Sequence, residues 1–301
     1  MTELLRIAPE VEQLLHESGP VVALETTLVA HGFPPSVGVE VGLAAEAAVR
    51  AEGAVPATVG VLDGAVVVGL DQGQLERFGE AGAEARKAGP RDLAACAAQG
   101  SLGATTVGGT LAVCRLAGIR FLGTGGIGGV HRGFAERPDV SADLVELART
   151  PALVVSSGAK SLLDVPATAE VLETLGVPVL GYRTDELPLF YAAAGGPPVS
   201  ARVDSPQEAA SLARAHWAIG GSGLLLARPP DESLDDVEPL FEEALGAAQA
   251  EGVRGPAVTP FVLARVHERS GGRTTEANKA LVLANARLAA RVAIELQEGP
   301  R

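Results

Sequence analysis

The sequence has few aromatic residues and no basic surplus. Phe, Tyr and Trp make up 3% of its 301 residues, so Ala, Val and Leu must fill most of the core. Its 37 acidic and 24 basic residues give a formal net charge of −13. Because so acidic a chain repels a phosphate backbone, no nucleic acid polymer is expected as a partner. One small phosphorylated ligand in a local basic pocket remains compatible with this charge.

Cysteine and long apolar runs are scarce as well. Cys96 and Cys114 lie in Ala- and Leu-rich stretches, so two buried free thiols are expected rather than a disulfide or a zinc site. Residues 1–15 are acidic and amphipathic, without the basic start and apolar core of a signal peptide. Gly or charged residues interrupt the apolar runs, so no membrane partner is expected. The protein is expected to be cytoplasmic.

Apolar runs of strand length alternate with helical patterns along most of the chain. This alternation predicts an α/β fold, layered α/β/α, with a central mixed, mostly parallel sheet and a helical C-terminal region. The apolar runs around Asp63-Gly64 within 57–70 predict an antiparallel hairpin, which makes the sheet mixed. No composition shift marks a linker, so a single domain over 1–301 is expected.

The patterns also place the individual elements. Helices are expected at 3–17, 37–53, 72–80, 91–99, 108–117, 143–149, 167–175, 206–218 and, with a break around 252–258, from Asp235 onward. Strands are expected at the start of 20–30 and within 119–126, 152–158, 177–182 and 223–227. Loops are expected at 125–140 and 185–204.

Lysine is rare: of the 24 Lys and Arg residues, only Lys87, Lys160 and Lys279 are lysine, and the rest are arginine. Arginine stays protonated and cannot form an imine, whereas a lysine that has lost hydration can act as a nucleophile. Lys160 follows the apolar strand and small residues of ALVVSSGAK, where an α/β sheet places its ligands. A surface lysine at a helix start is the alternative.

Glu25 stands in the apolar run VVALETT. Burying a carboxylate is costly unless it is paired or protonated, and such surroundings suit general acid–base work. The alternative is a glutamate at an exposed strand end that pairs with an arginine. His31 follows closely in the sequence and is expected to line the same cleft.

The glycine-rich segment GTGGIGGVHRG, residues 123–133, follows an apolar strand. Its backbone N–H groups, with His131 and Arg132, can hold a phosphate, although the spacing fits neither a P-loop nor a dinucleotide site. A purely structural loop is equally compatible. In the DVSAD segment that follows, Asp139 can cap a helix or hold a hard cation through waters.

Taken together, these segments resemble the pseudouridine-5'-phosphate glycosidase family, also called the indigoidine synthase A-like family. The resemblance runs in order from residue 23 to about 266 and is weaker in NKALVLANA. The matching motifs are ALETTLVAHGFP, VPATVGVLDG, GATTVGGT, GTGGIGGVHRG, DVSADLVELA, SSGAKSLLD, GVPVLGYRTDELPLF and TPFVLARV.

The resemblance implies reversible cleavage of pseudouridine 5'-phosphate to uracil and ribose 5-phosphate, with Mn²⁺ or another divalent cation and a homotrimeric assembly. It implies that Lys160 is the nucleophile, Glu25 the proton donor and Asp139 the metal-associated residue. Asp143 is a weaker candidate for handling protons at uracil C5. The substrate contacts implied are Lys87, Val107, Thr124, His131, Ser141, Ala142, Asp143 and, less securely aligned, Asn278.

Two other functions remain open at this stage. A different Schiff-base lyase or aldolase acting on a sugar phosphate would share Lys160 and the glycine loop. A sugar-phosphate sensor without catalytic activity would not need Glu25, Lys160 and Asp139 together.

Overall fold

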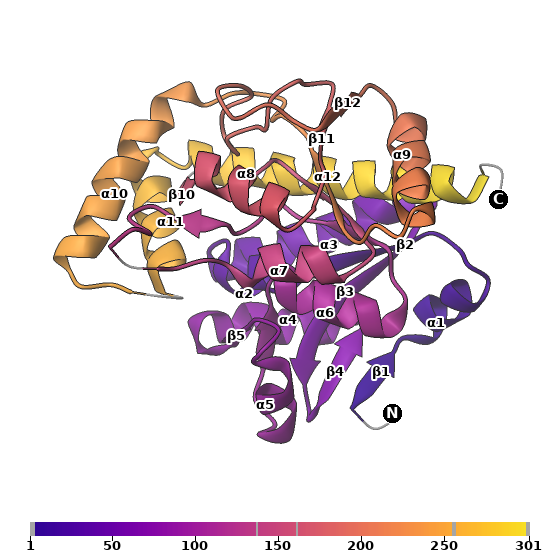
Figure 1. Ribbon diagram of the computed structural model, residues 1–301. Helices are drawn as coiled ribbons and strands as arrows, with labels where there is room; N and C mark the ends of the chain where they lie inside the picture. Colours follow the sequence, from indigo (N-terminus) through magenta and orange to yellow (C-terminus); the bar gives the residue numbers. More distant parts are fainter. Residues whose placement is uncertain (1–3, 137, 161, 255–256, 299–301) are drawn as a thin grey trace.

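The protein is a layered α/β structure in which helices cover both faces of a central sheet (Figure 1). The computed structural model describes residues 4–136, 138–160, 162–254 and 257–298. In Figure 1 the long yellow helix α12 crosses the molecule, with α10 and α11 at one end and α9 at the other. The expected fold class is therefore confirmed, including the helical C-terminal region.

Within the described residues, the main sheet contains 11 strands. Nine form the path β1-β4-β3-β2-β7-β9-β13-β11-β12, while β6 pairs with β3 and β5 pairs with β6. Its pairings are parallel except for β3 with β4 and β3 with β6. The strands are β1 Leu5–Ile7, β2 Val21–Glu25, β3 Val55–Leu62, β4 Ala65–Val68, β5 Arg86–Ala88, β6 Gly103–Thr105, β7 Phe121–Gly123, β9 Leu153–Ser156, β11 Val179–Tyr182, β12 Ala201–Val203 and β13 Leu224–Ala227. A separate antiparallel pair is formed by β8 Val130–His131 and β10 Leu163–Asp164.

Helices fill the connections and the C-terminal region. They are α1 Pro9–His16, α2 Thr27–His31, α3 Pro35–Ala51, α4 Gln72–Ala81, α5 Leu93–Ala98, α6 Val107–Ala117, α7 Ala142–Arg149, α8 Val165–Thr174, α9 Pro206–Ala218, α10 Glu238–Ala250, α11 Val258–Arg269 and α12 Arg273–Glu298. Short 3₁₀ turns lie at Gly82–Glu84 and Asp235–Val237.

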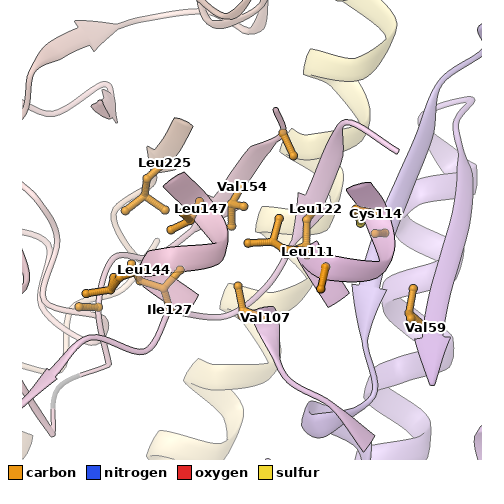
Figure 2. Packing of buried hydrophobic residues seen from close by; sticks show 14 of the residues in the cluster. Val59, Val107, Leu111, Cys114, Leu122, Ile127, Leu144, Leu147, Val154 and Leu225 are labelled. Atoms are coloured by element: carbon orange, nitrogen blue, oxygen red, sulfur yellow. The ribbon is translucent and has the colours of Figure 1, made fainter. Parts of the chain in front are cut away.

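The central strands are buried on both faces, as expected for parallel strands covered by helices. Successive side chains alternate between two cores. Leu122 and Val154 belong to the core under α6 and α7, while Phe121 and Leu153 belong to the core under α3, α9 and α12. Figure 2 shows the first core, where Leu111 of α6 lies near the strand residues. The sheet is thereby fixed between two helical layers.

Most expected elements are present, and the differences are short strands and the short helix α2, which the sequence did not predict. The helix expected at 3–17 is wrong at its start, because Leu5–Ile7 form β1 and pair with β4. The expected loop 185–204 ends in β12, and the loop 125–140 contains β8. Strands of two or three residues are too short to show a hydrophobic period, so neighbouring strands determine them.

The hairpin between β3 and β4 is confirmed. Asp63 and Gly64 both have positive φ, 50° and 74°, which is the geometry that a two-residue turn of this kind requires. Cys96 and Cys114 are buried with free thiols. No helix in the described part of the chain is long and apolar enough to cross a membrane.

Candidate active site

Two adjoining cavities open where β2, β7 and β9 end. Ligands of α/β sheets bind at such carboxyl ends. Glu25, Thr27, Lys87 and Lys160 line both cavities and form what we call the shared wall. The structure thus brings Glu25 and Lys160, both singled out in the sequence, to one wall although they are far apart in the chain.

The first cavity, here the apolar cavity, contains about 520 Å³ of space. Beyond the shared wall, its lining is mainly carbon, from Leu28, Phe190, Pro260 and Leu263, with Asn278 and His31 as polar members. Such a lining suits a flat, weakly polar ring with a few hydrogen-bonding atoms.

The second cavity, here the polar cavity, contains about 440 Å³ of space. Beyond the shared wall, its lining includes Thr106 and Val107 at the start of α6, Gly128 and His131 of the glycine loop, and Ser141 and Asp143 at the start of α7. The shared lysines and the histidine favour an anion here. The polar cavity is therefore suited to a phosphorylated group.

Glu25 ends β2 and is 3% exposed. The Thr124 hydroxyl donates a hydrogen bond of 2.5 Å to Glu25 Oε1. Burial raises the pKa of Glu25, against the lowering effects of Lys160, the Thr124 bond and Lys87. The alternative of an exposed strand end paired with an arginine is excluded, and the carboxyl group is suited to carrying a proton.

Lys160 is half-buried at the end of the segment that follows β9. This segment runs beside the glycine loop, because the Ile127 N–H donates to Gly158 O and the Lys160 N–H donates to Ile127 O. Gly158 has φ +86°, and a Cβ there would collide with Pro188 O, so only glycine fits. The alternative of a surface lysine at a helix start is wrong.

The other two lysines differ from each other in their surroundings. Lys87, in β5, lies in the shared wall, and burial lowers its pKa, with the nearby Lys160 acting in the same direction. Lys279, on α12, instead forms an ion pair of 3.2 Å with Glu276. Two of the three lysines of the sequence therefore lie at the cavities, as their rarity suggested for functional positions.

Asp143 joins two walls of the polar cavity. Its Oδ1 accepts the Gly108 N–H of α6 at 2.7 Å, and its Oδ2 accepts the Gly128 N–H of the glycine loop at 2.8 Å. A Cβ on Gly128 would collide with Ser141 Oγ, so the loop passes close to the start of α7. The glycine loop is therefore part of the site, and Asp143 holds it in place.

The N-terminus of α7 is capped by Ser141. Its Oγ accepts the Asp143 N–H at 3.2 Å, so Ser141 is the N-cap and the cap proposed for Asp139 is wrong. Asp139 is half-buried, and its backbone carbonyl accepts the His131 N–H. Burial lowers the pKa of His131, while the Asp139 carboxylate raises it.

The donor set at Asp139 fits a hydrated cation better than a closed protein cage. No group of three His, Cys, Asp or Glu side chains at metal-binding spacing occurs among the described residues. Magnesium and similar hard ions are commonly held by one carboxylate, waters and a substrate phosphate. Asp139 therefore fits as one ligand of a cation whose remaining ligands are water or substrate.

The remaining predicted contacts fall in different places. Val107 and Ser141 line the polar cavity, and Asn278 lines the apolar cavity. Thr124 is fully buried behind Glu25, and Ala142 is exposed at the first turn of α7.

Two acceptor atoms in the apolar cavity's wall are buried without a partner among the described residues, namely Nδ1 of His31 and Oδ1 of Asn278. His31 Nε2 lies 2.9 Å from Ala85 O, and burial lowers the pKa of His31. Because a carbonyl oxygen only accepts, Nε2 carries the proton and Nδ1 is an acceptor.

Sequence reasoning missed most of the apolar cavity. Phe190 arrives from the loop 185–204, and its N–H donates to Ser157 O. Pro260 and Leu263 come from α11, whose TPFVLARV motif was a signal for them. Phe190 ends the GVPVLGYRTDELPLF motif, but its φ of 66°, a strained conformation of the kind that gathers at functional sites, cannot be predicted from that motif.

Comparison with known proteins covers nearly the whole chain. The family model described as indigoidine synthase A like protein matches residues 10–295. The pseudouridine-5'-phosphate glycosidase of Herpetosiphon aurantiacus is 49% identical over 98% of this chain and 99% of its own length. That of Paracoccus denitrificans is 48% identical over 97% of this chain and 98% of its own length.

Two solved structures are also similar. The prealnumycin C-glycosynthase AlnA, in complex with ribulose 5-phosphate, has a TM-score of 0.89 and 42% identity, covering 98% of both chains. An indigoidine synthase A-like protein from Thermotoga maritima has a TM-score of 0.88 and 36% identity, covering 98% of this chain and 97% of its own. Because the family model matches residues 10–295 and relatives of nearly 50% identity cover almost the whole chain, the chain belongs to the indigoidine synthase A-like family.

Proposed function

We propose that this chain is an enzyme that reversibly cleaves the C–C glycosidic bond of pseudouridine 5'-phosphate, giving uracil and ribose 5-phosphate. The observation that carries the proposal is the shared wall, which sets Lys160 and Glu25 between a polar and an apolar cavity. Such a substrate has a phosphorylated sugar at one end and a flat base at the other. Its scissile bond would lie at the boundary, next to the lysine.

The first step uses both members of the shared wall. The Lys160 amine attacks C1', and the C1'–O4' bond breaks while the Glu25 carboxyl group delivers its proton to O4'. A C–C glycoside has no leaving-group heteroatom that an acid could protonate. A pair of acid and base groups alone therefore does little to accelerate its cleavage. The raised pKa of Glu25 favours the protonated form that can donate this proton.

The second step breaks the C–C bond. In the ring-opened adduct, the Lys160 nitrogen lone pair forms an imine to C1', and the C1'–C5 bonding electrons leave with uracil, whose C5 then takes a proton. Water hydrolyses the imine, which releases ribose 5-phosphate and regenerates the amine. The proton transfer at C5 assigned to Asp143 stays a prediction, in addition to the structural contacts that Asp143 makes.

The polar cavity would hold the sugar phosphate. Lys87 supplies positive charge, and His131 supplies one N–H donor. The apolar cavity would hold uracil, with Phe190 and Leu263 against the ring. The unpaired acceptors of His31 and Asn278 match the chemistry of a base that carries two N–H groups.

Uracil release tests this function directly. Purified protein is incubated with pseudouridine 5'-phosphate, with and without added Mn²⁺, and uracil is followed by chromatography. Uridine 5'-phosphate, whose base is joined through nitrogen, is the matched control substrate. Release of uracil from the C-linked compound alone is expected, and no release under either condition would contradict the proposal.

A second candidate function is C–C bond formation between a sugar phosphate and another ring. The similarity to the C-glycosynthase in complex with ribulose 5-phosphate favours it. It would use the same lysine and is one form of the broader Schiff-base chemistry on sugar phosphates. A panel of pentose phosphates with and without uracil separates the two, because only the glycosidase joins uracil to ribose 5-phosphate.

We also propose that Asp139 helps to hold Mn²⁺ or another divalent cation through waters, next to the phosphate end of the substrate. When bound, such an ion supplies positive charge that offsets the phosphate. Asp139→Asn should lower the affinity for Mn²⁺, measured by calorimetry in the presence of ribose 5-phosphate.

The family resemblance further leads us to propose a homotrimer that works in the cytoplasm. Sedimentation equilibrium tests the assembly, for which a mass near three times 30.5 kDa is expected. A monomer mass at all protein concentrations would contradict it.

A further inference from the structure

Asn285 is a fully buried polar residue. Neither the sequence motifs nor the proposed chemistry assigns a role to it. It lies on α12, the long helix that packs across β2, β7 and β9. The helix backbone comes unusually close to the sheet at this point, because a Cβ on Gly123 would lie 2.9 Å from the Cα of Ala286. The Asn285 side chain is therefore held at the carboxyl end of the sheet.

The side-chain amide of Asn285 reaches the two segments that leave β7 and β9. Its Nδ2 donates to Thr124 O at 2.8 Å and to Ser157 Oγ at 3.1 Å, with a longer contact of 3.4 Å to Gly125 O. The Ser157 N–H in turn donates to Gly125 O at 2.8 Å. One amide group thus joins both segments at the point where they separate from the sheet.

Each of these segments leads to one side chain of the shared wall. Thr124 donates through its hydroxyl to Glu25, and the segment beginning at Ser157 delivers Lys160 three residues later. The Asn285 Oδ1 atom is buried without a partner among the described residues. Leaving a buried acceptor without a hydrogen bond costs free energy. The stabilising contribution of the Asn285 side chain therefore comes from its N–H donors.

We infer that Asn285 is a positioning residue that fixes the placement of Glu25, through Thr124, relative to Lys160, through Ser157. The inference rests on the proposed function for its kinetic consequence. Asn285 touches neither cavity and acts only through these two segments. Misplacement of a reacting group by about 1 Å can lower the rate about 10²-fold, which sets the scale of the expected effect.

Loss of Asn285 should also alter the acid behaviour of Glu25. Besides Thr124, the groups that act on Glu25 are the charges of Lys160, Lys87 and Asp143. The Thr124 bond favours the ionised carboxylate, so weakening it raises the pKa of Glu25. The acid form then persists to higher pH, and the alkaline limb of the kcat profile moves upward.

The experiment is a double-mutant cycle of Asn285→Ala and Thr124→Val, with pH profiles of uracil release for each variant. Each single variant should lose about 10²-fold in kcat, with little change in KM, and should show the same upward shift of the alkaline limb. Because the effect of Asn285 on Glu25 passes through Thr124, while its effect on Lys160 passes through Ser157, the double variant should lose less than the product of the single losses. Losses that multiply, or an unshifted limb, would overturn the inference.

Val292→Ala is the matched control, since it truncates another fully buried side chain of α12 away from the cavities. It should lower the melting temperature without moving the pH profile. Asn285→Ser, which keeps a hydroxyl donor, is the second variant if Asn285→Ala does not fold, and it should recover part of the rate.

A crystal structure of the Asn285 variant gives a readout independent of activity. Thr124 Oγ1 is expected to lie beyond hydrogen-bonding distance of Glu25, and an unchanged contact would contradict the inference. If the wild-type protein releases no uracil, the proposed function fails, while this structural comparison still tests the positioning role.

Discussion

The polar and apolar cavities share a wall but are built from different parts of the chain. The polar cavity uses strand ends, helix N-termini and a glycine loop, almost all from residues 87–163. The apolar cavity instead brings together α2, the loop 185–204 and the C-terminal helices α11 and α12. Local motifs therefore build the phosphate side, and long-range packing builds the base side.

This difference assigns different tasks to the two regions. Backbone N–H groups and lysines recognise an anion by position and charge, so a short motif is sufficient for that task. Carbon-lined space recognises a ring by shape, which requires side chains from several directions. Family members with different ring substrates are therefore expected to differ more in the apolar cavity than in the polar cavity.

The largest effect is expected at the shared wall. Lys160→Ala should reduce uracil release by about 10⁴-fold or more, since it removes the nucleophile for any substrate that uses either cavity. Steady-state kinetics measures the loss. Lys279→Ala, which removes the lysine paired with Glu276 outside the cavities, is the matched control and should retain ordinary turnover.

A substitution that weakens binding of the substrate phosphate should have a kinetic effect of intermediate size. Lys87→Met should raise KM for pseudouridine 5'-phosphate about 10- to 100-fold, the range for losing a charged hydrogen bond. With pseudouridine, which lacks the phosphate, the variant and the wild type should differ far less. An equal loss on both substrates would show that Lys87 does not bind the phosphate and would break the division between the cavities.

A smaller effect is expected on the base side. Leu263→Ala removes part of the apolar wall and should raise KM for uracil several-fold in the synthetic direction, because the smaller side chain weakens uracil binding by about 1 kcal/mol. KM for ribose 5-phosphate should stay unchanged. Val266→Ala, at a buried position of the same helix outside the cavity lining, controls for reduced stability.

The smallest effect concerns stability rather than rate. Burial raises the folded-state pKa of Glu25 above 4.5, so the folded protein binds more protons than the unfolded chain between these two values. Stability therefore falls as pH rises from 4.5 through the raised pKa. Glu25→Gln cannot ionise and should be more stable than wild type at about pH 8, by about 1.4 kcal/mol for each pH unit that separates the two pKa values.

Thermal unfolding without substrate measures this difference. Near pH 4, where Glu25 is protonated in both states, the variant and the wild type should unfold at similar temperatures. A variant that is less stable than wild type at the higher pH would contradict the raised pKa.

The sequence predicted the elements whose cause is local. The period of the apolar residues predicted the long helices and central strands, and Asp63-Gly64 predicted the hairpin. The edge strands β1 and β12 escaped prediction because each has three residues and depends on its neighbour in the sheet. Their formation is a consequence of tertiary pairing rather than of their own composition.

The candidate site divides in the same way. Glu25 is conspicuous in sequence because it interrupts an apolar run, and Lys160 because lysine is rare and this one follows an apolar strand. Phe190 and Asn285 lie in the motifs GVPVLGYRTDELPLF and NKALVLANA, but their importance arises from a loop conformation and from a helix crossing the sheet. Neither feature can be obtained from the residue's own neighbours in the chain.

The central claim is that Lys160 forms a covalent bond with the opened pentose, and reductive trapping tests it most directly. Borohydride is added to the protein during turnover of pseudouridine 5'-phosphate, and peptides are analysed by mass spectrometry. A reduced ribose-phosphate adduct on Lys160, and on neither Lys87 nor Lys279, is the predicted result. Uracil release with an unmodified Lys160 would contradict the account.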